Sequence, residues 1–147
     1  MSESKNIVIA SDHAGVVMKK VIVDMLKEQG YEVNDLGPFN EDSVDYPDYA
    51  HSLAEQIQNG KADFGILMCG SGNGVAMTAN KHSKVRAAVS WNDELAALAR
   101  QHNNANVLSL PARFIDTHAA KKMVSVFLTT EFEGGRHEKR VNKIGAK

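Results

Sequence analysis

The sequence predicts an α/β fold built on a five-stranded parallel sheet. Short apolar runs rich in β-branched residues recur along the chain, and segments with helical spacing of apolar residues lie between them. Parallel strands need crossover connections of this kind, most often a helix. The 147 residues fit a single domain, 1–147, which is long enough to bury a core without disulfides or metal ions.

Five apolar runs mark the expected strands. They cover approximately residues 6–10, 32–35, 62–68, 85–89 and 106–109. Open parallel sheets bind ligands outside the carboxyl ends of their strands. Residues 11–15, Cys69 and Arg113 follow the first, third and last of these strands. We therefore expect all three groups to face the same edge of the sheet.

Apolar periodicity and end signals place the helices. They are expected at approximately residues 17–29, 46–58, 93–100 and 116–128, with a final basic helix from about 136 to 145. Gly30 and Gly60 follow the first two helices, and glycine is common just past a helix end. Pro47 fits a first helical turn, and Asn92 is an expected N-cap.

Charge and cysteine content limit the possible partners and compartments. Basic and acidic residues nearly balance, 17 against 18, so net charge gives no argument for a nucleic-acid or membrane partner. No run approaches the roughly 18 apolar residues of a membrane span. Residues 1–5 are polar and lack the apolar core of an export signal. With a single cysteine and hence no intramolecular disulfide, we expect a cytoplasmic, reducing setting.

Cys69 is a candidate catalytic thiol because it joins an apolar strand to the glycine-rich turn 70–74. Such a turn can direct several backbone N–H groups at one point, and Ser71 can add a hydroxyl donor. It is therefore suited to stabilising an oxyanion such as an enediolate. The glycine spacing fits neither a dinucleotide-binding motif nor a Walker loop. The alternative is that Cys69 is a small buried hydrophobic residue.

Three polar residues are candidates for acid–base or hydrogen-bonding roles. His102 is expected at the end of a helix, where the negative end of the dipole favours a protonated ring suited to a general acid. A helix C-cap without chemistry is the alternative. Asp12 and His13 follow the first strand, and they could instead form a turn and cap a helix.

Three arginines could bind an anion. Arg136 and Arg140 lie four residues apart, hence on one face of the final helix, and guanidinium groups bind phosphate through paired hydrogen bonds. Arg113 could complete a clamp. The alternative is a solvated terminal helix, because basic residues outnumber acidic ones five to one from Arg136 through Lys147. No metal site is predicted, since three further histidines lack metal-ligand spacing: His51, His82 and His118.

Taken together, these motifs resemble the ribose-5-phosphate isomerase B family, the ribose/galactose-phosphate sugar isomerases. The resemblance spans nearly the whole chain. It rests on ordered blocks at residues 11–15 (SDHAG), 45–47 (DYP), 69–74 (CGSGNG), 79–81 (ANK), 100–108 (RQHNNANVL) and 133–141 (EGGRHEKRV).

The resemblance implies a Rossmann-like three-layer α/β/α sandwich. It also implies a metal-free aldose–ketose isomerase without cofactors, which interconverts D-ribose 5-phosphate and D-ribulose 5-phosphate through a cis-enediolate. The expected assembly is a homodimer, or a tetramer, with the site between two subunits and the C-terminal helix contacting the neighbour.

The same resemblance implies roles for individual residues. Cys69 would be the base that moves a proton between C1 and C2, and His102 would assist opening of the furanose ring. Further contacts are implied with the sugar hydroxyls or ring oxygen (Asp12, His13 and Asn103), the enediolate (Gly70, Ser71, Gly72, Asn73 and Gly74) and the phosphate (Arg113, Arg136 and Arg140). Two positions depart from the common pattern: Ser71, where threonine is frequent, and Asn73, where an aliphatic residue is frequent.

Two other functions stay open at this point. A six-carbon relative acting on allose 6-phosphate or galactose 6-phosphate would use the same base and enediolate. A nonenzymatic phosphate- or nucleotide-binding dimer would need the anion sites but neither Cys69 nor His102, so the presence of both residues argues against it.

Overall fold

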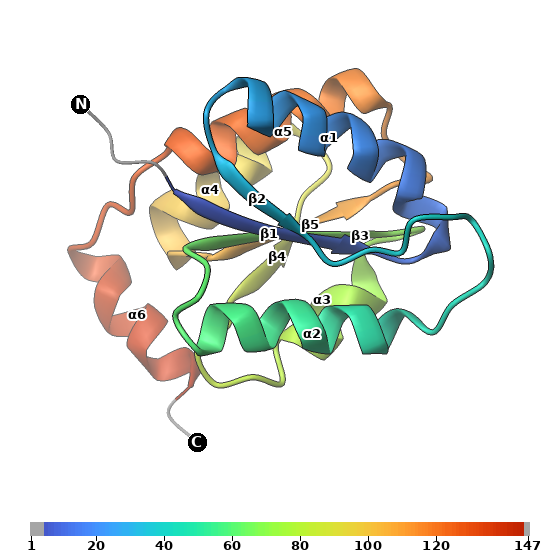
Figure 1. Cartoon of the computed structure of the whole chain (residues 1–147). Coiled ribbons are helices and arrows are strands. Elements are labelled where there is room, and N and C mark those ends of the chain that lie inside the picture. The colour runs from blue at the N-terminus through green and yellow to red at the C-terminus, as the bar shows by residue number, and fades with distance from the viewer. Residues whose placement is uncertain (1–4, 146–147) are drawn as a thin grey trace.

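The computed structural model describes residues 5–145, in which a five-stranded sheet lies between two layers of helices (Figure 1). The strands are β1 (Asn6–Ser11), β2 (Glu32–Asp35), β3 (Phe64–Cys69), β4 (Ala87–Val89) and β5 (Val107–Pro111), in the spatial order β2-β1-β3-β5-β4. Every neighbouring pair is parallel. The predicted Rossmann-like α/β/α sandwich is confirmed. The polar residues 1–4 and Lys147 lie outside the described residues.

The helices cover both faces of the sheet. They are α1 (Val16–Glu28), α2 (Tyr46–Gln58), α3 (Asn73–Ala79), α4 (Asp93–Asn103), α5 (Thr117–Thr129) and α6 (Arg136–Ile144), with a 3₁₀ turn η1 (His13–Gly15) before α1. Helices α1, α4 and α5 lie on one face, α2 and α3 on the other, and α6 stands beyond the amino ends of the strands (Figure 1).

The order of the strands locates a ligand site. After β1 the chain passes to α1 on one face of the sheet, and after β3 it passes to α3 on the opposite face. The carboxyl ends of β1 and β3 therefore form the topological switch point, where open α/β sheets bind ligands. Both strands are almost wholly buried, since helices cover each face.

Alternating side chains of the central strands build two cores. Ile7 and Ile9 of β1 pack with α1 and α5, whereas Val8 and Ala10 pack with α2. Cys69 belongs to the second core, together with residues of α2 and α3. The sulfur at the end of β3 is therefore held by packing on the α2 face.

Helix α3 was missed by the sequence analysis, which stops at the glycine-rich turn. Gly72, with φ 78°, adopts the left-handed conformation at the N-cap, and the helix follows immediately. A Cβ at Gly74 would lie 2.5 Å from a ring carbon of Tyr46, so a larger residue here would displace the Tyr46 side chain at the contact between α2 and α3. Packing rather than helix propensity therefore stabilises this seven-residue helix.

The predicted bounds of β2 and α2 are confirmed, and the other element boundaries differ from the expected ones by at most three residues. Helix α4 continues to Asn103, which places His102 in its last turn, and Asn104 ends it in the left-handed conformation at φ 46°. The N-cap prediction at Asn92 is confirmed, because its side chain accepts a hydrogen bond from the amide of Leu95. Within residues 5–145, no helix combines the length and apolar character of a membrane span.

The irregular connection before α2 is anchored by a partly buried ion pair. Lys19, 2% exposed, donates to both carboxylate oxygens of Asp35 at 2.7 and 2.8 Å. Asp35 also accepts from the amide of Gly37, at 2.9 Å. Farther along this connection, the amide of Val44 donates to His13 Nδ1 at 3.3 Å. The connection is thus tied both to the end of β2 and to the residues that follow β1.

Candidate active site

The carboxyl edge of the sheet gathers the predicted residues that follow strands. The amide of Asp12 donates to the carbonyl of Met68 at 3.1 Å, which joins the end of β1 to β3. The amide of Ala112 donates to the carbonyl of Cys69 at 2.9 Å, which joins β3 to the segment after β5. The expectation that the residues after these strands share one edge is confirmed.

Cys69 ends β3 with its side chain buried and 6% of the residue exposed. The amide of Gly72 donates a hydrogen bond to its Sγ atom at 3.2 Å. Burial alone fits the alternative of a packed hydrophobic residue. The amide of Gly72 adds a polar contact to the sulfur at the switch point of the sheet.

The glycine-rich turn is seated firmly on β5. Ser109 Oγ donates to the carbonyl of Gly72 at 2.6 Å, and a Cβ at Gly72 would lie 3.2 Å from backbone atoms of β5. Ser71 Oγ accepts from the amide of Asn73 at 3.2 Å, so its own hydroxyl hydrogen points elsewhere. The side chains of Ser71 and Asn73 are both exposed at this edge.

Arg113 lies across the start of the same turn. Its amide donates to the carbonyl of Gly70 at 3.0 Å, and its guanidinium Nη1 lies 3.1 Å from the point that a Cβ of Gly70 would occupy. Arg113, one of the three predicted phosphate ligands, is therefore next to Cys69 in the same chain.

Asp12 and His13 complete the carboxyl edge. Asp12 Oδ1 accepts from the amide of Ala14 at 2.8 Å and so caps η1, which agrees with the helix-cap interpretation for this oxygen. His13 Nδ1 accepts from the amide of Val44, so the neutral ring carries its proton on Nε2. His13 can therefore present an N–H donor.

His102 and Asn103 lie at the opposite, amino edge of the sheet. They end α4, which runs back from the carboxyl end of β4, and the next residues enter β5. There the amide of Asn106 donates to the carbonyl of Arg86, and its own carbonyl accepts from Gly65 at the start of β3. At about 3.3 Å per residue, the five residues of β5 alone separate the two edges by roughly 13 Å.

His102 lies close to two other side chains, those of His137 and Glu133. Its ring stacks on that of His137, with centroids 4.2 Å apart and planes inclined by 12°. Glu133 Oε1 lies 3.8 Å from His102 Nε2 and 3.5 Å from His137 Nε2. The Glu133 amide donates to the carbonyl of Gln101 at 3.0 Å, which holds this segment against α4.

His137 is the most enclosed of these groups. Desolvation lowers its pKa below the usual histidine value, and the neighbouring His102, Arg136 and Arg140 lower it further, whereas Glu133 acts in the opposite direction. These surroundings favour the neutral ring of His137.

Arg136 and Arg140 project from α6 into solvent. His137 is the buried residue of this helix, and both arginines are exposed. Within one chain they lie at the amino edge, while Arg113 lies at the carboxyl edge. The structure thus brings Cys69, Asp12, His13 and Arg113 together, and it places His102, Asn103, Arg136 and Arg140 in a second group.

A family model described as Ribose/Galactose Isomerase matches residues 7–144. The chain belongs to this family. The resemblance stated from the sequence is thereby confirmed, and with it the prediction that the chain is an isomerase.

Relatives within the ribose/galactose isomerase family match along almost their whole length. Ribose-5-phosphate isomerase B of Escherichia coli is 42% identical over 142 residues, which cover 97% of this chain and 95% of that protein. The crystal structure of a ribose 5-phosphate isomerase from Thermotoga maritima has a TM-score of 0.96 at 46% identity, covering 99% of this chain and 100% of the other. Ribose-5-phosphate isomerase B from Mycoplasma genitalium, with bound ribulose 5-phosphate, has a TM-score of 0.94 at 48% identity, covering 99% and 97%.

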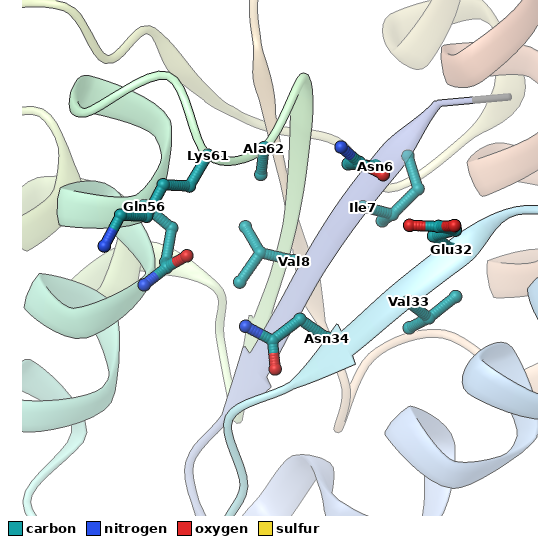
Figure 2. Close-up of a pocket in the computed structure, with 9 residues that line it drawn as sticks. All are labelled: Asn6, Ile7, Val8, Glu32, Val33, Asn34, Gln56, Lys61 and Ala62. Atoms are coloured by element: carbon teal, nitrogen blue, oxygen red, sulfur yellow. The ribbon is translucent and has the colours of Figure 1, made fainter. Parts of the chain in front are cut away.

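Two cavities differ in how they relate to the predicted site residues. One, of about 230 Å³, opens at the amino edge between β1, β2 and α2, and Figure 2 shows Val8 and Asn34 pointing into it. It contains none of the predicted site residues. The other, of about 460 Å³, borders the glycine-rich turn at Ser71 and Asn73, and exposed Trp91 and Phe114 give it an apolar wall.

Sequence reasoning missed the partners of His102. Glu133 and His137 are named only within a motif block, and no local pattern says that this block packs against the end of α4. It also missed the apolar side chains of Trp91 and Phe114 beside the turn. A signal for these two was present, since each lies two or three residues after a strand.

Proposed function

We propose that this chain interconverts D-ribose 5-phosphate and D-ribulose 5-phosphate. The observation that carries the proposal is the position of Cys69, whose sulfur lies at the switch point of the sheet beside the amide of Gly72. The relative from Mycoplasma genitalium, whose structure holds ribulose 5-phosphate, supports the choice of substrate.

Cys69 is the base in this proposal. Its thiolate removes the proton from C2 of the open-chain aldose, the C1 carbonyl becomes an enediolate oxygen, and the proton returns at C1. The hydroxyl proton moves from O2 to O1, so the ketose forms with no net loss of protons. Backbone amides of residues 70–74 and the hydroxyl of Ser71 stabilise the cis-enediolate, because hydrogen bonds to an oxyanion strengthen as its charge develops.

His102 assists the step before proton transfer. The furanose opens when the bond between C1 and the ring oxygen breaks, the ring oxygen gains a proton and the C1 hydroxyl loses one. An imidazole can supply the first proton and accept the second. Asp12, His13 and Asn103 bind the sugar hydroxyls, and the Nε2–H of His13 provides a donor for this role.

The catalytic unit in this proposal is a homodimer, or a tetramer built from such dimers. Cys69 and His102 lie at opposite edges of one sheet, so they meet on one sugar only if the amino edge of one chain faces the carboxyl edge of another. Helix α6 of the neighbour then brings Arg136 and Arg140 to the phosphate beside Arg113. The large exposed apolar side chains near the turn suit a subunit contact: Met77, Trp91 and Phe114, which are 68%, 59% and 76% exposed.

In the proposed mechanism, side chains and backbone amides perform every step of ring opening and proton transfer. Residues 1–147 act as one domain. We therefore expect full activity in EDTA. A reducing, cytoplasmic compartment fits the proposal because it keeps the single thiol, Cys69, free for proton transfer.

The second candidate substrate is a six-carbon sugar phosphate, since the family description names galactose as well as ribose. Asn73 supports it too, because this exposed amide beside the turn could bind an additional hydroxyl. The test is to supply ribose 5-phosphate, allose 6-phosphate and galactose 6-phosphate separately, with EDTA present, and to follow the ketose by NMR. Turnover of the six-carbon substrates alone would favour the second candidate over ribose 5-phosphate. Turnover of none of the three would contradict both candidates.

A further inference from the structure

Two imidazoles and a carboxylate converge at the amino edge. One ligand atom from each of His102, Glu133 and His137 lies within 4.8 Å of the other two. They come from α4, from the segment before α6 and from α6 itself. The proposed isomerisation uses His102 but gives no role to Glu133 or His137.

This donor set matches a familiar kind of metal site. Two histidines with one glutamate bind zinc in open sites that leave a fourth position for another ligand. Metal–ligand bonds of about 2.0–2.2 Å place tetrahedral ligand atoms roughly 3.3–3.6 Å apart. The distances from Glu133 Oε1 to the two Nε2 atoms are 3.5 and 3.8 Å. The separations from the carboxylate thus need to change by only a few tenths of an ångström.

We propose that His102, Glu133 and His137 bind a divalent transition metal ion, with Zn²⁺ as the preferred case, and that the bound ion reversibly inhibits the enzyme. The inhibition follows because the metal occupies Nε2 of His102. This second part rests on the proposed function, in which His102 assists ring opening, whereas metal binding itself does not.

The surroundings set limits on the affinity. The stacked rings must leave their parallel arrangement so that both nitrogens point at one ion, and the His102 ring has room to tilt because 40% of its side chain is exposed. His137, with a side chain 10% exposed, stays in place. Arg136 and Arg140 on the same helix repel a cation, while the carboxylate of Glu133 offsets part of their charge. We therefore expect micromolar binding that a chelator reverses.

A second histidine pair offers a matched control. His51 Nδ1 lies 2.8 Å from His82 Nε2, closer than the contacts in the His102 cluster. Among residues 5–145, the His102 cluster is the single group of three metal-ligating side chains, so the His51 pair lacks a third ligand. Zinc binding that needs only a close histidine pair would weaken when His51 is replaced. Zinc binding at the proposed site would not change.

The first experiment is isothermal titration of the metal-stripped full-length protein with ZnCl₂ in the absence of substrate. We expect one ion per chain, and at least roughly tenfold weaker binding in Glu133→Gln and His137→Asn. His51→Asn and Cys69→Ala should bind as the wild type does. Glu133 is half exposed, so its variant tests the site even if His137→Asn fails to fold by circular dichroism. The absence of zinc binding, or an equal loss of zinc affinity in His51→Asn, would overturn the proposal. A loss of zinc affinity confined to Cys69→Ala would also overturn it, because the metal would then bind the thiol.

The second experiment measures turnover of ribose 5-phosphate with and without Zn²⁺ for each variant. We expect Zn²⁺ to reduce wild-type turnover and EDTA to restore it. In Glu133→Gln, the ratio of turnover with Zn²⁺ to turnover without it should approach one. Zinc binding at this site without a change in turnover would contradict the inhibitory role. A protein that binds zinc here but turns over no sugar phosphate would instead contradict the proposed function, which the titration does not use.

Discussion

The two edges of the sheet present their functional side chains in different ways. At the carboxyl edge, Asp12, Cys69 and Arg113 lie at or within two residues of strand ends, and backbone hydrogen bonds between neighbouring segments fix their positions. At the amino edge, Arg136 and Arg140 stand on a helix that is anchored through the single buried side chain of His137. The core therefore positions the proposed reacting group, whereas the proposed phosphate ligands depend on where α6 lies.

In the proposed function, neither edge is complete within one chain. The carboxyl edge has a thiol, amide donors and one arginine. Its imidazole, His13, is proposed to bind sugar hydroxyls, so this edge lacks the imidazole proposed to open the furanose ring. The amino edge has His102 and two arginines, but lacks a thiol, because Cys69 is the chain's one cysteine. Under the proposed function, one site therefore needs two chains, and each edge can be tested separately and then together.

The largest effect is expected from Cys69→Ala at the carboxyl edge. Isomerisation should be abolished, since the thiol is the proposed base, while the fold and phosphate binding stay nearly intact. The measurement is turnover by NMR, with circular dichroism to confirm folding and solvent deuterium incorporation to follow proton exchange. A folded variant with more than about a tenth of wild-type kcat, a change in barrier of less than roughly 1.4 kcal/mol, would mean that another residue is the base.

At the amino edge, His102→Asn should impair ring opening more than proton transfer. General acid–base catalysis is typically worth about 10²–10⁴-fold, so turnover of ribose 5-phosphate should fall by that order. Erythrose 4-phosphate cannot close to a furanose through its phosphorylated O4, so if it is a substrate the variant should keep more activity on it. The same fractional loss on both sugars would refute the ring-opening role.

A smaller effect is expected from the arginines of α6. Arg136→Ala and Arg140→Ala should each weaken binding of a phosphate-bearing substrate or inhibitor by roughly 1.5–3 kcal/mol, the range for hydrogen bonds to charged groups. Lys143→Ala, on the same exposed helix, is the control and should change binding much less. Titration calorimetry measures all three. Equal small losses would favour a solvated helix over a phosphate clamp.

The difference between the edges also explains what the sequence could predict. Residues of the carboxyl edge follow apolar runs, and parallel strands end at one edge, so Cys69 and Arg113 could be placed together from local patterns. The approach of His137 to His102 depends on how α6 packs against α4, which no local pattern specifies. Helix α3 was missed for a related reason, since Gly72 and Gly74 indicate a turn and only burial against α2 makes the helix stable.

The positions of His102 and Cys69 illustrate the same limit at the level of the site. Each was identified from its local surroundings, one at a helix end and one at a strand end. The family resemblance implies that both act on one sugar, yet their elements end at opposite edges of the sheet. Only the folded chain shows that separation, and in the proposed function a second chain brings the two residues to one sugar.

The central claim is that one site uses the carboxyl edge of one chain and the amino edge of another. The most direct test is to co-express Cys69→Ala and His102→Asn chains with different affinity tags, and to purify mixed dimers through both tags. In a two-fold symmetric dimer, one site then carries both substitutions and the other carries neither. We expect about half of wild-type turnover per dimer, far above either variant alone. Mixed dimers no more active than the mean of the two parent variants, or a fully active monomer at micromolar concentration, would contradict the shared site.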